Sequence, residues 1–111
     1  MVEKLLKEGV NINGSARHGT GLMMASKKGH GEVVEMLLRK GADMDLQDTE
    51  GFTALMLASQ ERHGEVVEML LGKGANMDMQ SRHGATALMY ASHNGHGEMV
   101  EMLLSKGANM D

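Results

Sequence analysis

Histidine and glutamate recur side by side at three places in the sequence, and this pairing is the first candidate for chemistry. The segment HGEVVEML occupies residues 30–37 and again 63–70, and the near copy HGEMVEML occupies 96–103. Imidazole and carboxylate groups act as general acids and bases and as metal ligands. Either the three copies meet in one site, or each serves the same structural role in its own unit.

The copies belong to a longer internal repeat. The segment GADMD at 41–45 returns as GANMD at 74–78 and at 107–111, in steps of 33 residues. Between these markers GFTALMLAS at 51–59 returns as GATALMYAS at 84–92. A fixed period of this length is typical of proteins built by stacking similar units.

The period also predicts the domain organisation. The whole chain, 1–111, is predicted to be a single domain that begins with a half repeat, which supplies only a second helix. The predicted units are the half repeat at 1–13 and full repeats at 14–46, 47–79 and 80–111.

Each full repeat has the pattern of two short helices. In the second repeat Thr53 is predicted to cap the first helix, because its hydroxyl can accept from an early backbone N–H. The second helix is predicted to start at Glu65, where a carboxylate suits the positive end of the helix dipole. Lys73 and Gly74 indicate where that helix stops. Helices shorter than about 12–15 residues are marginal alone in water, so these must pack against neighbours.

These residues resemble a known family. The pattern G-x-T-x-L-x-x-A-x-x-x-G-H-x-x-V-V-x-x-L-L-x-x-G-A, with its 33-residue period, is similar to the ankyrin repeat over nearly the whole chain. The resemblance implies an all-α solenoid in which antiparallel helix pairs stack and are joined by projecting β-turn loops. It also implies that the histidine of each Gly-His segment is structural.

The chain departs from the family pattern at several positions. Arg62 stands where the other repeats have Gly29 and Gly95, and it would be strained if that position requires a positive φ. Thirteen methionines and only two large aromatics are available to build the core, which we expect to be adaptable. Methionine also replaces the family's histidine in the T-P-L-H motif, at Met23, Met56 and Met89.

Repeat spacing argues against a shared active site or metal site. Equivalent residues lie on successive helix layers, which stack about 8–10 Å apart, whereas zinc needs each imidazole nitrogen within about 2.0–2.1 Å. His93 and His96 could bind a metal together, but the sequence offers them no third ligand. The glycine-rich connectors could hold an anion, although their recurrence favours a structural role. We therefore expect no catalytic residues, no metal and no cofactor.

A binding function is predicted from the positions that differ between repeats. The resemblance places these positions on the concave face, which is formed by the loop tips and first helices. Phe52 and Tyr90 are the natural anchors, because aromatic residues and arginine dominate interfaces. Met24 is another position that differs between the repeats. The predicted partner-binding residues are Arg17, His18, Lys27, Lys28, Glu50, Phe52, Leu57, Gln60, Glu61, Arg82, His83, Tyr90, His93 and Asn94.

Composition narrows the partner class. The net charge of −4 argues against a nucleic-acid partner, and the opening MVEKLLKEG has neither a signal-peptide pattern nor a membrane span. The absence of cysteine fits an intracellular location, cytoplasmic or nuclear. The sequence thus predicts a non-enzymatic module that binds another protein.

A structural or self-associating scaffold is the alternative. The half repeat lacks a first helix, and no polar capping repeat precedes Asp111, so both ends are candidates for head-to-tail stacking. A natural fragment of a longer array and a designed repeat protein would both account for the close internal copying.

Overall fold

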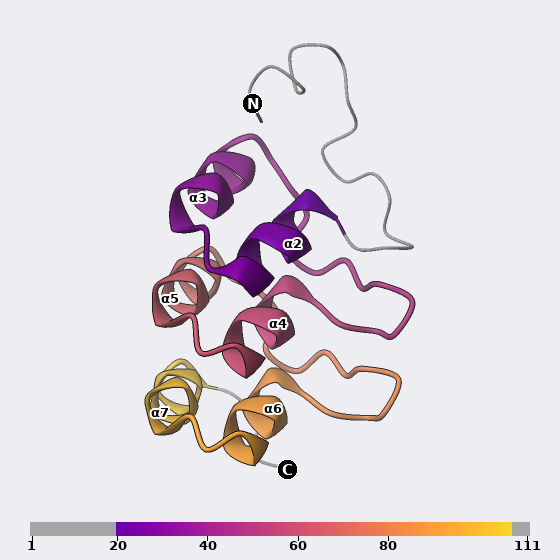
Figure 1. The fold of residues 1–111 in the computed structure, drawn as a ribbon, viewed down its shortest axis with the longest axis vertical. Coiled ribbons are helices and arrows are strands. Elements are labelled where there is room, and N and C mark those ends of the chain that lie inside the picture. The colour runs from indigo at the N-terminus through magenta and orange to yellow at the C-terminus, as the bar shows by residue number, and fades with distance from the viewer. Residues whose placement is uncertain (1–19, 108–111) are drawn as a thin grey trace.

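Residues 20–107, the part of the chain that the computed structural model describes, fold into stacked helix pairs (Figure 1). The helices are α2 (Gly21–Lys28), α3 (Gly31–Arg39), α4 (Ala54–Gln60), α5 (Gly64–Gly72), α6 (Ala87–His93) and α7 (Gly97–Ser105). The first helices α2, α4 and α6 form one column and the second helices α3, α5 and α7 another, while long loops project to the side (Figure 1). The predicted all-α solenoid is confirmed; the predicted half repeat 1–13 lies outside the described residues.

Threonine hydroxyls fix the start of each first helix. The hydroxyl of Thr53 accepts a hydrogen bond from the backbone N–H of Met56 at 3.2 Å, as predicted. Thr20 and Thr86 make the same bond in the other repeats, at 3.2 and 3.3 Å. An N-cap side chain satisfies one of the free N–H groups of the first turn. Each of these bonds therefore stabilises the start of a short helix.

The second helices start and stop at recurring signals. Helix α5 begins at Gly64, one residue before the predicted Glu65, which lies in the first turn. Its C-cap is Lys73, and Gly74 follows with a φ of 93°, a conformation that glycine adopts without strain. The predicted stop is therefore confirmed.

The core lies between the helix columns and between successive repeats. Its large members include Leu22, Leu55, Val67 and Leu70, none of which exposes more than 1% of its surface. Met23 and Met56, which replace the family's histidine, are also buried, so methionine fills the space between repeats as predicted. Not every methionine does so: Met24 and Met89 are 56% and 42% exposed.

Arg62 occupies a left-handed backbone position. Its φ is +62°, and the equivalent Gly29 and Gly95 have φ values of +75° and +71°. The loop between the two helices therefore sets this backbone conformation, whichever residue stands at the position. A left-handed conformation costs a non-glycine residue about 1–2 kcal/mol, so this loop holds the strain that the sequence predicted.

Replacing Arg62 with glycine should increase the free energy of unfolding by about 1 kcal/mol, because the left-handed conformation would no longer be strained. Arg62 is exposed, so little packing is lost with its side chain. Urea denaturation followed by circular dichroism measures the change. Arg62→Ala is the control, since alanine keeps the strain; equal gains from both variants would contradict the strain explanation.

Two serine hydroxyls are buried without a hydrogen-bond partner in the described structure. They belong to Ser26 and Ser59, at equivalent positions of α2 and α4. A buried hydroxyl without a partner costs about 1–3 kcal/mol in mutational data. We expect Ser59→Ala to stabilise the protein by about 1 kcal/mol in thermal or urea unfolding.

The matched control for this substitution is Ser92→Ala. Ser92 occupies the same position in α6 but is exposed, so its hydroxyl is hydrated and the substitution should change stability by less than about 0.5 kcal/mol. If Ser92→Ala stabilised the protein as much as Ser59→Ala, the gain would reflect helix propensity instead of the buried hydroxyl.

Candidate protein-binding face

The first helices place one side chain of each repeat on a common outer face. Met24 of α2, Leu57 of α4 and Tyr90 of α6 occupy equivalent positions, with Met24 largely exposed and the other two half-buried. The three form an apolar column that crosses the repeats. The first-helix face is defined by this column together with Lys27, Lys28, Phe52, Gln60, Glu61, His93 and Asn94.

The two aromatic residues lie against each other across the boundary between repeats. The ring centroids of Phe52 and Tyr90 are 5.2 Å apart with an interplanar angle of 40°. The Tyr90 hydroxyl is 2.7 Å from the hydroxyl of Ser81, which fixes the ring at its far end. Both rings are half-buried and pack against the core, so contacts within the domain fix this part of the face.

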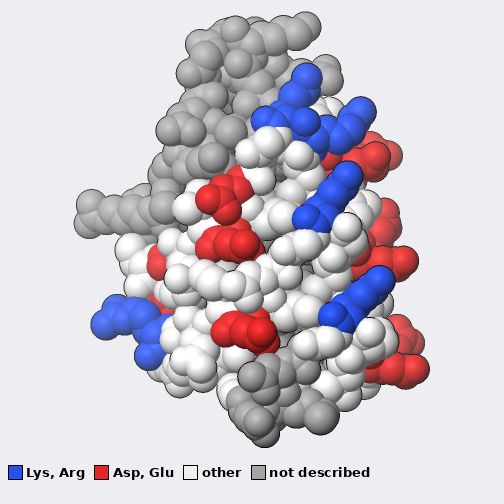
Figure 2. Space-filling view, turned by 180° about the vertical axis from the view of Figure 1, so that it is seen from behind, with Lys and Arg blue, Asp and Glu red and all other residues white. Residues whose placement is uncertain are grey.

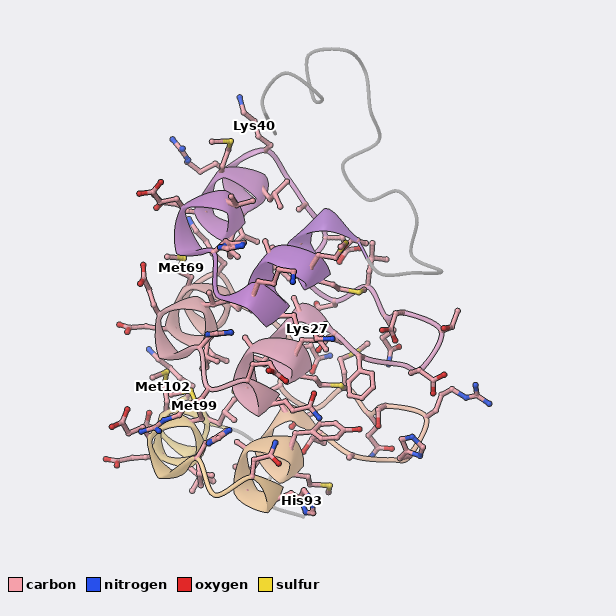
Figure 3. All side chains as sticks on the ribbon, in the orientation of Figure 1. Lys27, Lys40, Met69, His93, Met99 and Met102 are labelled. Carbon is pink, nitrogen blue, oxygen red and sulfur yellow. The ribbon has the colours of Figure 1, made fainter. Side chains whose placement is uncertain are left out.

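Charged and polar side chains border the apolar column at the C-terminal ends of the first helices. Lys27 and Lys28 make the border basic in the first repeat, and Glu61 beside the exposed Arg62 makes it mixed in the second. In the third repeat His93 is exposed, and Figure 3 shows Lys27 and His93 on the same side of the stack. The first-helix face therefore combines an apolar centre with a polar border whose charge changes from repeat to repeat.

Hydrogen bonds from a side-chain amide and from the backbone hold the projecting loops in register. In the second-repeat loop, residues 47–52, the side-chain amide of Gln47 donates to the carbonyls of Gly51 and Gln80 at 2.9 and 2.8 Å. The backbone N–H of Arg82 donates to the Glu50 carbonyl at 2.9 Å. The exposed tips that carry Glu50, Arg82 and His83 are thus fixed relative to one another.

The recurring histidines connect successive repeats. The Nε2 atom of His63 is 2.8 Å from the Lys27 carbonyl oxygen, and that of His96 is 2.9 Å from the Gln60 carbonyl oxygen. Since a carbonyl oxygen only accepts, each Nε2 carries the hydrogen. Each imidazole therefore donates to the end of the preceding repeat's first helix, which satisfies one of that helix's terminal carbonyls.

The geometry of the described residues offers no metal centre and no membrane-spanning helix. Between residues 20 and 107, no three histidine, cysteine, aspartate or glutamate side chains come close enough together to hold a metal ion. Within that same range, no helix combines the length and hydrophobicity needed to cross a bilayer.

A family model described as ankyrin repeats (3 copies) matches residues 1–81 and 22–111. The chain belongs to the ankyrin-repeat family. Ankyrin repeats are generally protein–protein interaction modules, and the family is generally non-enzymatic.

One curated relative matches part of the chain. The chain is 43% identical over 42 residues to the E3 ubiquitin-protein ligase mind-bomb of Drosophila melanogaster. The match covers 38% of this chain and 3% of that protein. The ankyrin domain therefore corresponds to a small part of this relative's length.

Most of the predicted binding residues lie together in the ankyrin domain. Those of the first helices share the first-helix face, and Glu50, Arg82 and His83 lie at the loop tips beside it. Asn94 also has a structural contact, since its side-chain amide is 3.4 Å from the Gln60 carbonyl. Arg17 and His18 lie outside the described residues.

The opposite face of the ankyrin domain has a different pattern of charges. Figure 2 shows lysine and arginine side chains in a column down this face, with acidic side chains on both sides of it. Lys40, Lys73 and Lys106 are the C-caps of the second helices. Cations at helix C-termini are favoured by the helix dipole, so structure alone accounts for them.

A hollow of about 360 Å³ lies between α3 and α5 on the side of the second helices. Its lining residues are Glu35, Leu38, Arg39, Met69, Gly72 and Lys73. It exists partly because Gly72 has no side chain where Arg39 and Ser105 stand in the other repeats. The charged groups of the hollow are the carboxylate of Glu35 and the cations of Arg39 and Lys73. This combination is typical of a solvated helix surface.

Sequence reasoning missed the contacts that glycine makes possible between repeats. A Cβ atom at Gly31 would lie 2.9 Å from Glu65 Oε1 and 3.3 Å from the Met69 methyl carbon. At Gly64 it would lie 3.0 Å from the methyl carbon of Met99. The sequence signal for these contacts was that glycine recurs at the first position of every second helix in the described repeats. Other residues are ordinarily tolerated at that position of a helix.

Proposed function

We propose that this ankyrin domain is a non-enzymatic protein-binding module and that its partner contacts the first-helix face and the adjoining loop tips. The observation that carries the proposal is the apolar column with its polar, variable border. Protein interfaces commonly have this arrangement, with an apolar centre that excludes water and a polar rim. In the family this face is the concave binding surface, so the position of the column supports the proposal.

The rigidity of the face supports the same function. The Phe52–Tyr90 pair and the bonds between loops are formed within the domain itself. A preformed surface loses less entropy on association, which favours recognition of a folded partner. The charge of the border changes from repeat to repeat, and this would select a partner with the complementary pattern.

Met24→Glu is the variant that tests this function most cleanly. Alanine at Phe52 or Tyr90 would remove packing within the domain, but Met24 is 56% exposed and its replacement should leave the fold intact. A charge in the apolar column should weaken partner binding at least tenfold, which corresponds to about 1.4 kcal/mol. Affinity capture with quantitative mass spectrometry identifies the partner, and calorimetry with the purified partner measures the affinity.

The matched control is Glu68→Lys, an exposed charge reversal on α5, on the opposite side of the repeat. We expect it to bind the partner like the unmodified domain. Circular dichroism should show the same helix content for both variants. Equal retention of the partner by Met24→Glu and Glu68→Lys, or equal loss, would refute the proposed binding face.

A further inference from the structure

The exposed methionines between residues 20 and 107 are Met24 and Met89, and they lie at different positions of their repeats. Met24 is 56% exposed and Met89 is 42% exposed. Met24 belongs to the apolar column of the first-helix face, whereas Met89 occupies the position of the buried Met23 and Met56 in its own repeat. Among the described methionines, only Met24 therefore combines solvent access with a place in the candidate binding face.

Solvent access decides which of these sulfur atoms a dissolved oxidant can reach. Met23, Met56 and Met99 are at most 2% exposed, so their thioethers are shielded in the folded domain. A sulfoxide at Met23 or Met56 would also place a polar group in the core between repeats, which is unfavourable. A sulfoxide at Met24 would lie in solvent and leave the core intact. An oxidant can therefore modify Met24 without unfolding the domain.

The equivalent positions in the apolar column carry no sulfur. They are Leu57 in α4 and Tyr90 in α6. Mild peroxide treatment leaves leucine and tyrosine side chains unchanged, whereas it converts a thioether to a sulfoxide. Oxidation of the column therefore changes it at one point, in the first repeat.

Two lysines lie one helical turn from the Met24 thioether. Lys27 and Lys28 follow it in α2 at the i+3 and i+4 positions, so all three side chains lie on the same side of the helix. Both lysines are exposed. A sulfoxide oxygen accepts hydrogen bonds and an ammonium group donates them, so either lysine can hold the new oxygen on the face. Oxidation would thus add a polar group to the column and engage a cation of its border.

We propose that Met24 is a reversible oxidation site that regulates binding at the first-helix face. Hydrogen peroxide is the oxidant: the Met24 sulfur attacks one peroxide oxygen, the O–O bond breaks, and the other oxygen leaves as water, which gives methionine sulfoxide. A thiol-dependent reductase reverses the change by forming a disulfide from its thiols and releasing the sulfoxide oxygen as water. The proposal rests on the proposed function, because oxidation of Met24 can affect binding only if the partner contacts this face.

The first part of the test needs no partner. The full chain is treated with hydrogen peroxide for increasing times, catalase stops the reaction, and tandem mass spectrometry of peptides separates Met24 from the neighbouring Met23 by fragment ions. Met24 should oxidise at least about ten times faster than Met23 and Met56, because its sulfur is accessible. Circular dichroism should show unchanged helix content. A rate at Met24 no higher than at the two buried positions would overturn the proposal.

The second part measures binding with the immobilised full chain. The chain is oxidised, freed of peroxide with catalase, and exposed to extract from cells that express it. The readout is the retention of those proteins that the unmodified chain captures and Met24→Glu does not. Retention should fall about tenfold on oxidation, because the sulfoxide is a polar group in an apolar contact. Treatment of the oxidised chain with methionine sulfoxide reductases should restore it.

Met24→Leu and Met89→Leu form a matched pair of variants. Each is compared with itself before and after peroxide, so its own affinity does not enter the result. Retention by Met24→Leu should not change on oxidation, since leucine has no sulfur. Retention by Met89→Leu should fall about tenfold, as for the unmodified chain, because Met24 is still present.

Loss of retention by oxidised Met24→Leu, or full retention by the oxidised unmodified chain, would overturn the proposal. Either result would leave the proposed function standing, because Met24→Glu and Glu68→Lys test that function without an oxidant. If no protein distinguishes the unmodified chain from Met24→Glu, the proposed function fails, and the regulatory role of Met24 fails with it.

Discussion

Replacing Gly51 with alanine should lower the free energy of unfolding of the ankyrin domain by about 2–5 kcal/mol, the largest effect we expect from a single methyl group. Gly51 has a φ of +81°, where alanine is strained by about 1–2 kcal/mol. The new Cβ would also lie 2.7 Å from the Arg82 nitrogen and 2.9 Å from Ser81 Cα. These are backbone atoms, so the loops themselves must separate, and overpacking of this kind costs about 1–3 kcal/mol more.

Urea denaturation monitored by circular dichroism measures this loss, and Gly84→Ala is its control. Gly84 has nearly the same φ, +76°, but open space around its Cβ position. Gly84→Ala should therefore lower the free energy of unfolding only by the backbone strain of about 1–2 kcal/mol. Equal losses at the two positions would show that contact between the loops contributes nothing and would contradict the described junction.

Gly29→Ala should destabilise the domain by about 2–3 kcal/mol, for a related reason. Its φ of +75° makes alanine strained, and the new Cβ would lie 2.6–2.9 Å from three atoms of the His63 ring. That ring is held at its other edge by the 2.8 Å bond to the Lys27 carbonyl. To accommodate the methyl group it must move and weaken that bond, which is worth about 1 kcal/mol.

A double-mutant cycle with His63→Ala isolates this second contribution. Once the ring is removed, Gly29→Ala should cost only the strain, as Gly95→Ala should in the third repeat, where the φ is +71° and the Cβ position is open. The coupling between positions 29 and 63 should be at least about 1 kcal/mol. Additive effects of the two substitutions would argue that His63 does not pack on Gly29.

Local features of the fold were predictable from the sequence. A threonine before an apolar helical stripe marks an N-cap through its own hydroxyl, and the bonds made by Thr20, Thr53 and Thr86 follow that rule. The strain at Arg62 was visible because two other repeats have glycine at that position. Both inferences need only the conformation of a few consecutive residues, which the repeat pattern fixes.

Contacts between repeats were not predictable in the same way. Phe52 and Tyr90 were identified as separate variable residues, and their contact depends on how the third repeat is placed on the second. Gly51 and Gly84 look equivalent in the sequence, yet one is enclosed and the other open. Such differences arise from side-chain direction and from position along the stack, and neither is encoded in a single repeat.

The candidate binding face was predictable from the sequence only in part. Its positions were predicted from variation between repeats, because framework residues are constrained by packing and surface residues are not. The exposure of Met24, which makes it the most accessible apolar side chain of the face, became evident only in the structure. The bond between Asn94 and the Gln60 carbonyl also shows that a variable residue can serve the framework.

Photo-crosslinking from the first-helix face tests the central claim most directly. A benzophenone amino acid replaces Met24 in one protein and Glu68, on α5, in a control, and both are irradiated in extract from cells that express the protein. We expect a discrete crosslinked partner from position 24 and none from position 68. A partner captured from position 68 alone, or equally from both positions, would contradict it.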